Sequence, residues 1–535
     1  MRIRAVSFCL AASLTKWSPA LAQTSAPAPV ITAVMNNSST IPAGFPNSGV
    51  APSSLFVIQG SGMATPGSTA MLQDSTAGLP ATLNGAGISV TVGGTTVTPA
   101  IYYSSPTQIA AVLPAATPTG TGTITVSYNG TPSAAAPIQV VPSAFGFDLY
   151  HGWAVATDAS SGALITETNS AQPGEVLIFW GTGLGSDPAD SDNTYTGSPH
   201  AIGTPVQMYV GNTPVPSSAI AYSGASVYPG VDVIGVTIPS GVINGCFVPL
   251  ALVTGSGASA VVSNVATLPI MNGGGSCSDA MTGMNGTLWS SLGAQSLVRT
   301  GEVEIGESVF NGTLSTLALV AFVNIGGPVY PDSAITGAVS VGGCSTLQIL
   351  STAPPNAVAA SETPLTFGNL SVQAPVGSYP VSAISGVYSM TLPASATPAP
   401  GGTFVFTGGG GTEVGPFTAT VTVPTPVLNW TNQSDAATVT RSQGLAVTWT
   451  GGAPGSYVHI LGSSSSGSAE GSFSCYAPQS ALQFTVPAFV LSALPAGKGT
   501  TGMQNLAPYA PFSATGLDTG EGVAYYSLSV STKVQ

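Results

Sequence analysis

Charged side chains are scarce in this sequence. Only 5% of its 535 residues are Asp, Glu, Lys or Arg, and seven basic residues stand against 20 acidic ones. Proteins that bind nucleic acid neutralise phosphates with clustered Lys and Arg, and anionic lipid surfaces attract similar basic clusters. The composition therefore argues against nucleic acid and anionic membranes as partners.

Long apolar runs are also missing. After the N-terminal segment, no run approaches the roughly 20 residues that a helix needs to cross a bilayer, so we expect no transmembrane segment. Hydrophobic residues nevertheless make up 44% of the chain, which excludes disorder driven by high charge and low hydrophobicity. The 67 Gly and 44 Pro, set between short Val, Ile and Thr runs, are typical of strands joined by tight turns. The predicted fold class is all-β, in several domains of about 100–200 residues each.

The first residues predict an export signal. Arg2 and Arg4 give a basic start, residues 5–14 form a short apolar region, and residues 20–22 (Ala-Leu-Ala) supply a small-x-small cleavage site. We therefore predict a cleaved signal peptide at residues 1–22. The product is expected to be secreted or held on the outer surface of a bacterium.

A flexible linker, residues 23–30, is predicted to follow the signal. Cleavage removes Arg2, Arg4 and Lys16, which leaves four of the seven basic residues against 20 acidic ones and a formal net charge of about −16. The partners we expect are an extracellular protein or a polysaccharide.

Four cysteines remain after cleavage: Cys246, Cys277, Cys344 and Cys475. An even number in an exported chain indicates disulfides, and four cysteines allow three connectivities. We favour Cys246–Cys277, because these residues frame the last strands of a repeated unit and a bridge closing about 30 residues would stabilise it by roughly 3–4 kcal/mol. Cys344–Cys475 follows by elimination. Metal binding by these cysteines is not expected, since no CxxC pair or nearby histidine gives tetrahedral spacing.

Two stretches about 120 residues apart repeat one plan. Each has an apolar strand followed by a Gly-x-Gly turn, a later strand ending in Val-Gly, and an apolar run ending in proline. The matching pairs are 55–58 and 176–179, 60–62 and 181–183, 92–93 and 210–211, and 109–114 and 233–239. Self-similarity of this kind indicates an array of one structural unit.

Four β-rich regions are predicted along the chain. Their boundaries are 31–142, 143–277, 278–424 and 425–535. Within the first, Asn129-Gly130 predicts a tight hairpin because both residues tolerate positive φ. Helical periodicity appears only briefly, near residues 287–297 and 488–494.

The first two units resemble IPT/TIG-type immunoglobulin-like domains. The resemblance rests on the repeated strands, the Gly-x-Gly and Val-Gly turns, and the late strands ending at Pro114 and Pro239. The second unit is also similar to an uncharacterised C-terminal domain of secreted proteins from Solibacter-like bacteria. That similarity is carried by residues 173–176, 180–185, 210–211 and 245–246, and a weaker match continues at 421–424 and 428–433.

The resemblance covers about half of the chain and implies tandem immunoglobulin-like β-sandwich domains, about four in all, after a cleaved signal peptide. It carries over no catalytic residues. The first unit departs from the second because it lacks the Trp, the cysteines and the long insertion at 186–199.

That insertion contains the metal candidates. Asp187, Asp190 and Asp192 supply hard oxygen ligands that suit Ca²⁺. The spacing lacks the order, central glycine and closing glutamate of an EF-hand, so the alternative is a solvated acidic loop. The preceding Gly-rich turn, 181–185, is followed by acidic residues and not by a helix, so we interpret it as structural and not as a dinucleotide site.

Trp153 and Trp430 are the candidates for stacking on a sugar, whereas Trp180 and Trp449 fall within strand patterns and predict core positions. His459 lies in an apolar strand and predicts a packed histidine.

Glu302 and Glu304 alternate with apolar residues, which predicts one solvent-facing side of a strand and not a glycosidase pair. No HExxH or GxSxG motif is present, so we expect neither catalytic residues nor a cofactor other than the candidate calcium.

These observations predict a secreted, non-enzymatic array with a binding, adhesion or surface-scaffold role. Two alternatives stay open. One is an array of extracellular carbohydrate-binding modules, and the other is a secreted hydrolase without a recognised motif.

Overall fold

The computed structural model describes residues 28–71, 78–196, 198–310, 313–326, 339–351, 362–384 and 387–535. The predicted signal peptide and residues 23–27 of the predicted linker lie outside the described residues. Antiparallel sheets dominate the described part, and they pair into tandem immunoglobulin-like β-sandwiches. The predicted all-β fold class is confirmed.

The first sandwich is built from residues 30–140. One sheet has the strand order β1-β2-β8-β7-β3, and the other has β10-β9-β5-β4 with β11 and β6 beside it. Their bounds are β1 Val30–Asn36, β2 Leu55–Ser61, β3 Ala70–Met71, β4 Thr82–Leu83, β5 Ala86–Val92, β6 Thr95–Val97, β7 Ala100–Ser104, β8 Gln108–Val112, β9 Gly120–Tyr128, β10 Thr131–Pro132 and β11 Ala136–Val140. Burial alternates along β5, so Ile88 and Val90 face the core beside Phe56. The predicted Asn129-Gly130 turn joins β9 to β10, with positive φ at both residues.

The second sandwich repeats this plan. Its sheets have the orders β12-β16-β21-β20-β17 (with β15) and β19-β18-β22-β23 (with β24), and a small hairpin pairs β13 with β14. The bounds are β12 Gly146–Phe147, β13 Leu149–Tyr150, β14 Trp153–Ala154, β15 Ala156–Asp158, β16 Val176–Thr182, β17 His200–Ala201, β18 Val206–Val210, β19 Thr213–Pro214, β20 Ile220–Ala225, β21 Asp232–Thr237, β22 Gly245–Thr254, β23 Val261–Val262 and β24 Ala266–Ile270. The equivalent strands β2 and β16 pair with the equivalent strands β8 and β21.

The last two regions are joined by one sheet, which has 12 strands among the described residues. Its main order is β27-β39-β38-β41-β43-β25-β26-β32-β31, with β28, β36 and β42 at its sides. The bounds are β25 Leu297–Phe310, β26 Thr313–Gly326, β27 Cys344–Leu350, β28 Glu362–Pro364, β31 Ala383–Ile384, β32 Val387–Leu392, β36 Thr438–Val439, β38 Tyr457–Ser466, β39 Ala469–Pro478, β41 Gly497–Leu506, β42 Ala510–Phe512 and β43 Thr519–Val534.

Two smaller layers cover this sheet and enclose separate cores. The layer β30-β29-β33-β34 packs on one end around Phe322 and Phe404, and β35-β37-β40 packs on the other around Trp449 and Ile460. The bounds are β29 Leu370–Gln373, β30 Ser378–Val381, β33 Gly402–Gly408, β34 Phe417–Val423, β35 Leu428–Trp430, β37 Leu445–Gly451 and β40 Gln483–Val486. Both cores therefore lie on one shared sheet.

Strand β43 makes the connection between the third and fourth regions. It pairs in parallel with β25, from Thr300↔Thr519 to Ser308↔Ser527, and antiparallel with β41 as far as Gly497↔Val534. Strand β27 lies between β26 and β28 in the sequence, yet it pairs with β39. Backbone pairing thus crosses the predicted boundary at 424/425, while the domain limits themselves stay predictions.

Short helices fill the connections. The described α-helices are α1, Gly286–Gly293, capped by the Asn285 side chain, and α3, Ala488–Ser492, both at the places where helical periodicity was expected. Five 3₁₀ turns span Ser217–Ala219, Gly257–Ser259, Gln433–Ala437, Arg441–Gln443 and Gln479–Ala481. Among the described residues, no helix has the length and apolar character that crossing a membrane requires.

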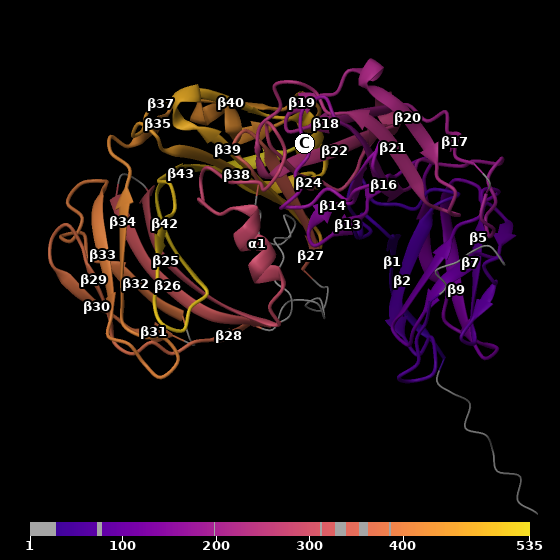
Figure 1. The fold of residues 1–535 in the computed structure, drawn as a ribbon, viewed down its shortest axis with the longest axis horizontal. Helices are drawn as coiled ribbons and strands as arrows, with labels where there is room; N and C mark the ends of the chain where they lie inside the picture. The colour runs from indigo at the N-terminus through magenta and orange to yellow at the C-terminus, as the bar shows by residue number, and fades with distance from the viewer. Residues whose placement is uncertain are drawn as a thin grey trace, which may run out of the picture.

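The sandwiches together form an arch (Figure 1), with α1 drawn within its span. The second sandwich contacts the C-terminal part of the molecule directly, next to the core around Trp449. Phe247 and Ser340 exchange two hydrogen bonds, in which the Phe247 N–H donates to the Ser340 hydroxyl (3.0 Å) and the Ser340 N–H donates to the Phe247 carbonyl (2.9 Å). The rings of Tyr209 and Phe489 lie 4.4 Å apart between centroids. The second sandwich is therefore a fixed junction in the middle of the chain.

Candidate binding pocket beside a disulfide

A hollow of about 210 Å³ opens on the second sandwich. The β13–β14 hairpin contributes Tyr150, His151 and Trp153, and the loop 164–168 contributes Glu167 and two threonines. Pockets for drug-sized ligands usually measure roughly 300–1,000 Å³. At about 210 Å³, this hollow has room for one small chemical group of a ligand.

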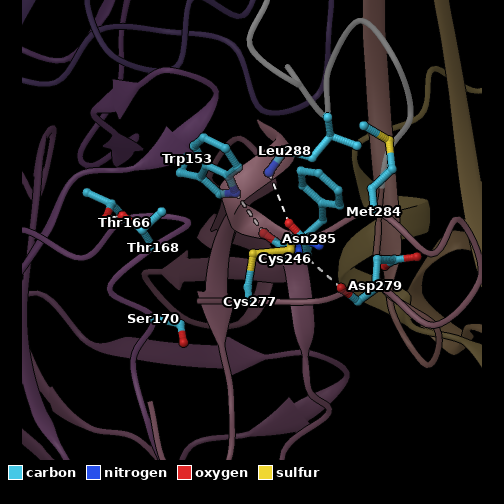
Figure 2. The surroundings of a disulfide bond; sticks show 12 residues. Trp153, Thr166, Thr168, Ser170, Cys246, Cys277, Asp279, Met284, Asn285 and Leu288 are labelled. Atoms are coloured by element: carbon cyan, nitrogen blue, oxygen red, sulfur yellow. Dashed lines mark hydrogen bonds between the residues drawn. A yellow bond between two sulfur atoms is a disulfide. The ribbon is translucent and has the colours of Figure 1, made fainter. Parts of the chain in front are cut away.

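The Cys246–Cys277 disulfide packs with Trp153, one of the residues that line the pocket, and the predicted preferred pair is confirmed. The Trp153 indole N–H donates to the Cys246 carbonyl at 2.7 Å, and its ring lies parallel to Phe247 with centroids 6.0 Å apart. Figure 2 shows Trp153 against the disulfide. Trp289 of α1 meets Phe247 edge-on. These aromatic contacts hold the disulfide in a small core of its own.

The sequence singled out Trp153 and Trp430 as exposed stacking rings, and the structure corrects this. Trp153 is 3% exposed and Trp430 is 5% exposed. Trp430 packs in the fourth core and donates its N–H to Asn432 at 3.0 Å. Both rings are buried because their strands turn them inward, so neither offers a face to a sugar. The exposed ring of the pocket is Tyr150.

A tight turn places Tyr150 at the pocket mouth. His151 and Gly152 both have positive φ, 54° and 84°, so a two-residue loop joins Tyr150 to its partner Trp153. The Tyr150 and His151 rings stack with centroids 3.7 Å apart and 24° between planes. Tyr150 remains 50% exposed, so an aromatic surface is open to a ligand.

Glu167 also lines the hollow, and sequence reasoning missed it. The residue is 9% exposed, yet within the described part of the chain its carboxylate has no hydrogen-bond donor, Lys or Arg as a partner. It acts on His151, where burial lowers the imidazole pKa and the Glu167 charge opposes that shift. His151 is therefore mainly neutral at pH 7, and it leaves the carboxylate charge uncompensated.

Hydrogen bonds from the segment around Cys277 hold the Glu167 backbone in place. The Cys277 N–H donates to the Glu167 carbonyl at 2.9 Å, and the Gly286 N–H donates to the Cys277 carbonyl at 2.8 Å. A Cβ on Gly286 would lie 1.8 Å from the Glu167 carbonyl oxygen, so only glycine fits at the start of α1. In Figure 2, Asn285 reaches the Leu288 N–H beside the disulfide. Hydrogen bonds therefore connect the Glu167 backbone to Cys277 of the disulfide, and Cys277 to the start of α1.

The acidic insertion lies at the joint between the first two sandwiches. Asp192 accepts from the Ala115 N–H at 2.8 Å, and Asp187 lies 2.5 Å from His200 through Oδ2 and Nε2. Asp187 is buried, whereas Asp190 and Asp192 are half-buried and much of the remaining loop is exposed to solvent. Within the described residues, no group of three His, Cys, Asp or Glu side chains is arranged to hold a metal. Calcium binding at Asp187, Asp190 and Asp192 stays a prediction. The contact of Asp192 with Ala115 joins the loop to the first sandwich.

Asp232 holds the Gly-rich turn in place. Its carboxylate accepts from the Gly183 and Leu184 N–H groups at 2.7 and 2.8 Å. Burial raises the Asp232 pKa to about 7. Next to it, Thr182 accepts from the Leu55 N–H of the first sandwich at 2.8 Å. The turn therefore has the structural role that the sequence indicated.

Other titratable groups lie on the shared sheet. Glu302 and Glu304 point to one face as predicted. Glu304 accepts from the Tyr525 hydroxyl at 2.7 Å. Burial and the neighbouring Glu302 raise the Glu521 pKa to about 7. His459 is packed as expected, bonded to Gln504 and Ser474.

No protein-family model matches this chain, and no curated protein is detectably similar to it in sequence. The resemblance to IPT/TIG domains stays a prediction.

Solved structures show weak likenesses. The chain is similar to the Bacteroides ovatus mixed-linkage glucan utilization protein SGBP-B, solved with a mixed-linkage heptasaccharide, at 12% identity and TM-score 0.20 over 66% of this chain and 68% of that one. It is also similar to the N-terminal eight Ig domains of Down syndrome cell adhesion molecule, at 10% identity and TM-score 0.12 over 91% of this chain and 46% of that one. A third is the chicken CNTN1 FN1–FN3 fragment, at 9% identity and TM-score 0.15 over 69% of this chain and 96% of that one. Likenesses at these TM-scores say nothing about a ligand.

Proposed function

We propose that this protein is an exported, non-enzymatic binding protein whose joined β-sandwiches present the pocket of Tyr150 and Glu167 to an extracellular ligand. Export is supported by the predicted signal peptide and by two disulfides, Cys246–Cys277 and Cys344–Cys475, because structural disulfides persist in oxidising compartments.

The uncompensated Glu167 carboxylate carries this proposal. Among the described residues the Glu167 carboxylate has no hydrogen-bond donor, Lys or Arg as a partner, and its oxygens are still reached by water. It lines an open hollow beside an exposed aromatic ring. A ligand that enters the hollow would supply the missing partner.

Binding fits the pocket better than catalysis. Glycoside hydrolysis usually requires two carboxylates, and the pocket lining has Glu167 alone. A hydroxyl nucleophile needs an adjacent base to activate it, whereas the Thr166 hydroxyl is hydrogen-bonded, among the described residues, to that of Thr168 alone, at 3.4 Å. We therefore place carbohydrate binding and hydrolysis behind the general binding role.

Calorimetric titration of the full chain with monosaccharides, oligosaccharides, amino acids and small amines tests the proposal. We expect at least one class to bind, with affinity reduced tenfold or more by Tyr150→Ala and by Glu167→Gln. Glu470→Gln is the matched control, because Glu470 is an exposed carboxylate on the distant strand β39. Absence of binding in every class, or equal affinity in all three variants, would contradict the proposal. Hydrolysis of any titrant would revive the enzymatic alternative.

A further inference from the structure

We infer that the group entering this pocket is a primary ammonium, held between the Glu167 carboxylate and the open face of Tyr150. This inference rests on the proposed binding function and adds the chemical class of the ligand. An amino sugar, a lysine side chain and a peptide N-terminus all present that group.

The charge of Glu167 is the first argument. Hydroxyl groups of a neutral sugar would donate to the carboxylate oxygens but would not neutralise the negative charge, whereas an ammonium does both. The four basic residues outside the predicted signal peptide are Arg299, Arg441, Lys498 and Lys533, and none of them lines the pocket. Among the described residues, no Lys or Arg is placed to neutralise the Glu167 carboxylate. A cationic ligand would supply the missing positive charge.

The surrounding chain favours a cation as well. With the predicted signal removed, 20 acidic residues face four basic ones, and a net negative charge raises the local concentration of cations. The neutral His151 beneath Tyr150 does not oppose them.

The pocket lining matches the donors of a primary ammonium. Such a group carries three N–H donors and no acceptor. Glu167 offers carboxylate oxygens, and the hydroxyls of Thr166 and Thr168 line the same hollow. Tyr150 stacks on His151 through one face and stays 50% exposed, and a cation within about 6 Å of an aromatic face is attracted by the ring. The volume of about 210 Å³ admits the end of a ligand and not a large one.

Matched pairs of probes, in which acetylation of the amine removes its charge, decide the question. We would titrate the full chain at pH 7 with glucosamine against N-acetylglucosamine, and with Nα-acetyl-lysine amide against its Nε-acetylated form. We expect each amine to bind at least tenfold more tightly than its acetylated partner. Glu167→Gln should abolish that preference, Tyr150→Ala should weaken both amines, and Glu470→Gln should leave the affinities unchanged. The sugar and lysine arms show which source of the ammonium is preferred.

The outcomes separate the two proposals. If neutral probes bind as tightly as the amines and Glu167→Gln weakens them equally, the binding function stands and the ammonium inference is overturned. If no probe binds, both are overturned. If the Glu167→Gln chain does not fold by circular dichroism, the ratio of amine to acetylated affinity in the unmodified protein decides, and a ratio near one overturns the inference.

Discussion

The two halves of this chain build β-sandwiches in different ways. In the N-terminal half, each of the first two sandwiches is built from one continuous stretch of sequence, and polar contacts such as Leu55 to Thr182 join the two. In the C-terminal half, strands from residues 297 to 534 share one sheet, and the last strand, β43, lies between β41 and β25. The same architecture is therefore local in one half and interleaved in the other.

This difference has a consequence for cooperativity. The joint between the first two sandwiches consists of separate side-chain and backbone hydrogen bonds, and each contributes roughly 1 kcal/mol. A continuous backbone ladder places both C-terminal cores on the same strand, since β43 contributes Ala524 and Tyr526 to one core and Val534 to the other. We expect the N-terminal sandwiches to unfold separately and the C-terminal pair to unfold as one unit.

Removing β43 gives the largest expected effect. A chain truncated after Asp518 lacks all 16 residues of this strand, so both β25 and β41 lose a neighbour. We predict that residues 297–518 lose their protection in amide hydrogen exchange, while residues 30–140 keep theirs.

The exposed substitution Ser529→Ala within β43 is the control and should leave protection unchanged. A truncated chain in which only the fourth core loses protection would contradict the view that the C-terminal half is one unit.

The sequence predicted the local half of the molecule better than the interleaved half. The repeat that pairs 55–58 with 176–179 identified equivalent strands, because each unit folds from adjacent residues. The pairing of Glu302 with Glu521 joins residues more than 200 positions apart, and alternation along each strand says which face is buried but not which strand is the neighbour. The strand that carries Glu302 and Glu304 was predicted, but its pairing with β43 was not.

The pocket shows the same limit. Both disulfides followed from cysteine counting and spacing. Trp153 was recognised near the site, but burial reversed its role because the turn at His151 and Gly152 turns the ring inward. Glu167 gave no signal, since an isolated Glu in a polar loop matches no motif and its importance arises from the absence of nearby partners.

The two disulfides sharpen the comparison. Loop-closure entropy predicts losses of roughly 5 kcal/mol for Cys344–Cys475, with a separation of 131 residues, and roughly 4 kcal/mol for Cys246–Cys277, with 31. Replacing Cys344 and Cys475 by Ala should lower the protection of both C-terminal cores. Replacing Cys246 and Cys277 should affect the second sandwich and weaken ligand binding at Glu167. Hydrogen exchange mapped by peptide distinguishes these patterns, and equal effects on all four regions would refute the proposed division.

The smallest expected effect is a pH dependence at the joint of the N-terminal half. Asp232 has a pKa of about 7 in the folded protein, because burial and the neighbouring Asp190 and Asp187 raise it above its ordinary value of 3.8. The folded state therefore binds this proton more tightly, and its stabilisation is complete below about pH 4 and lost as the pH rises through 7. Between pH 5 and 8 we expect the second sandwich to lose on the order of 2 kcal/mol, since one pKa unit corresponds to about 1.4 kcal/mol.

Asp232→Asn isolates this effect, because the amide oxygen can still accept from Gly183 and Leu184 but does not titrate. Calorimetric unfolding of both proteins across this pH range should show a transition that falls with pH in the unmodified chain and a flatter one in the variant. Glu521 titrates in the same range with the same sign, but it lies on the shared C-terminal sheet and is present in both chains, so it cancels in the difference. If the unfolding temperature of the N-terminal transition changed equally with pH in both proteins, titration of Asp232 would not control the stability of the second sandwich. The hydrogen bonds of Thr182 would then be the main stabilising contacts at the joint.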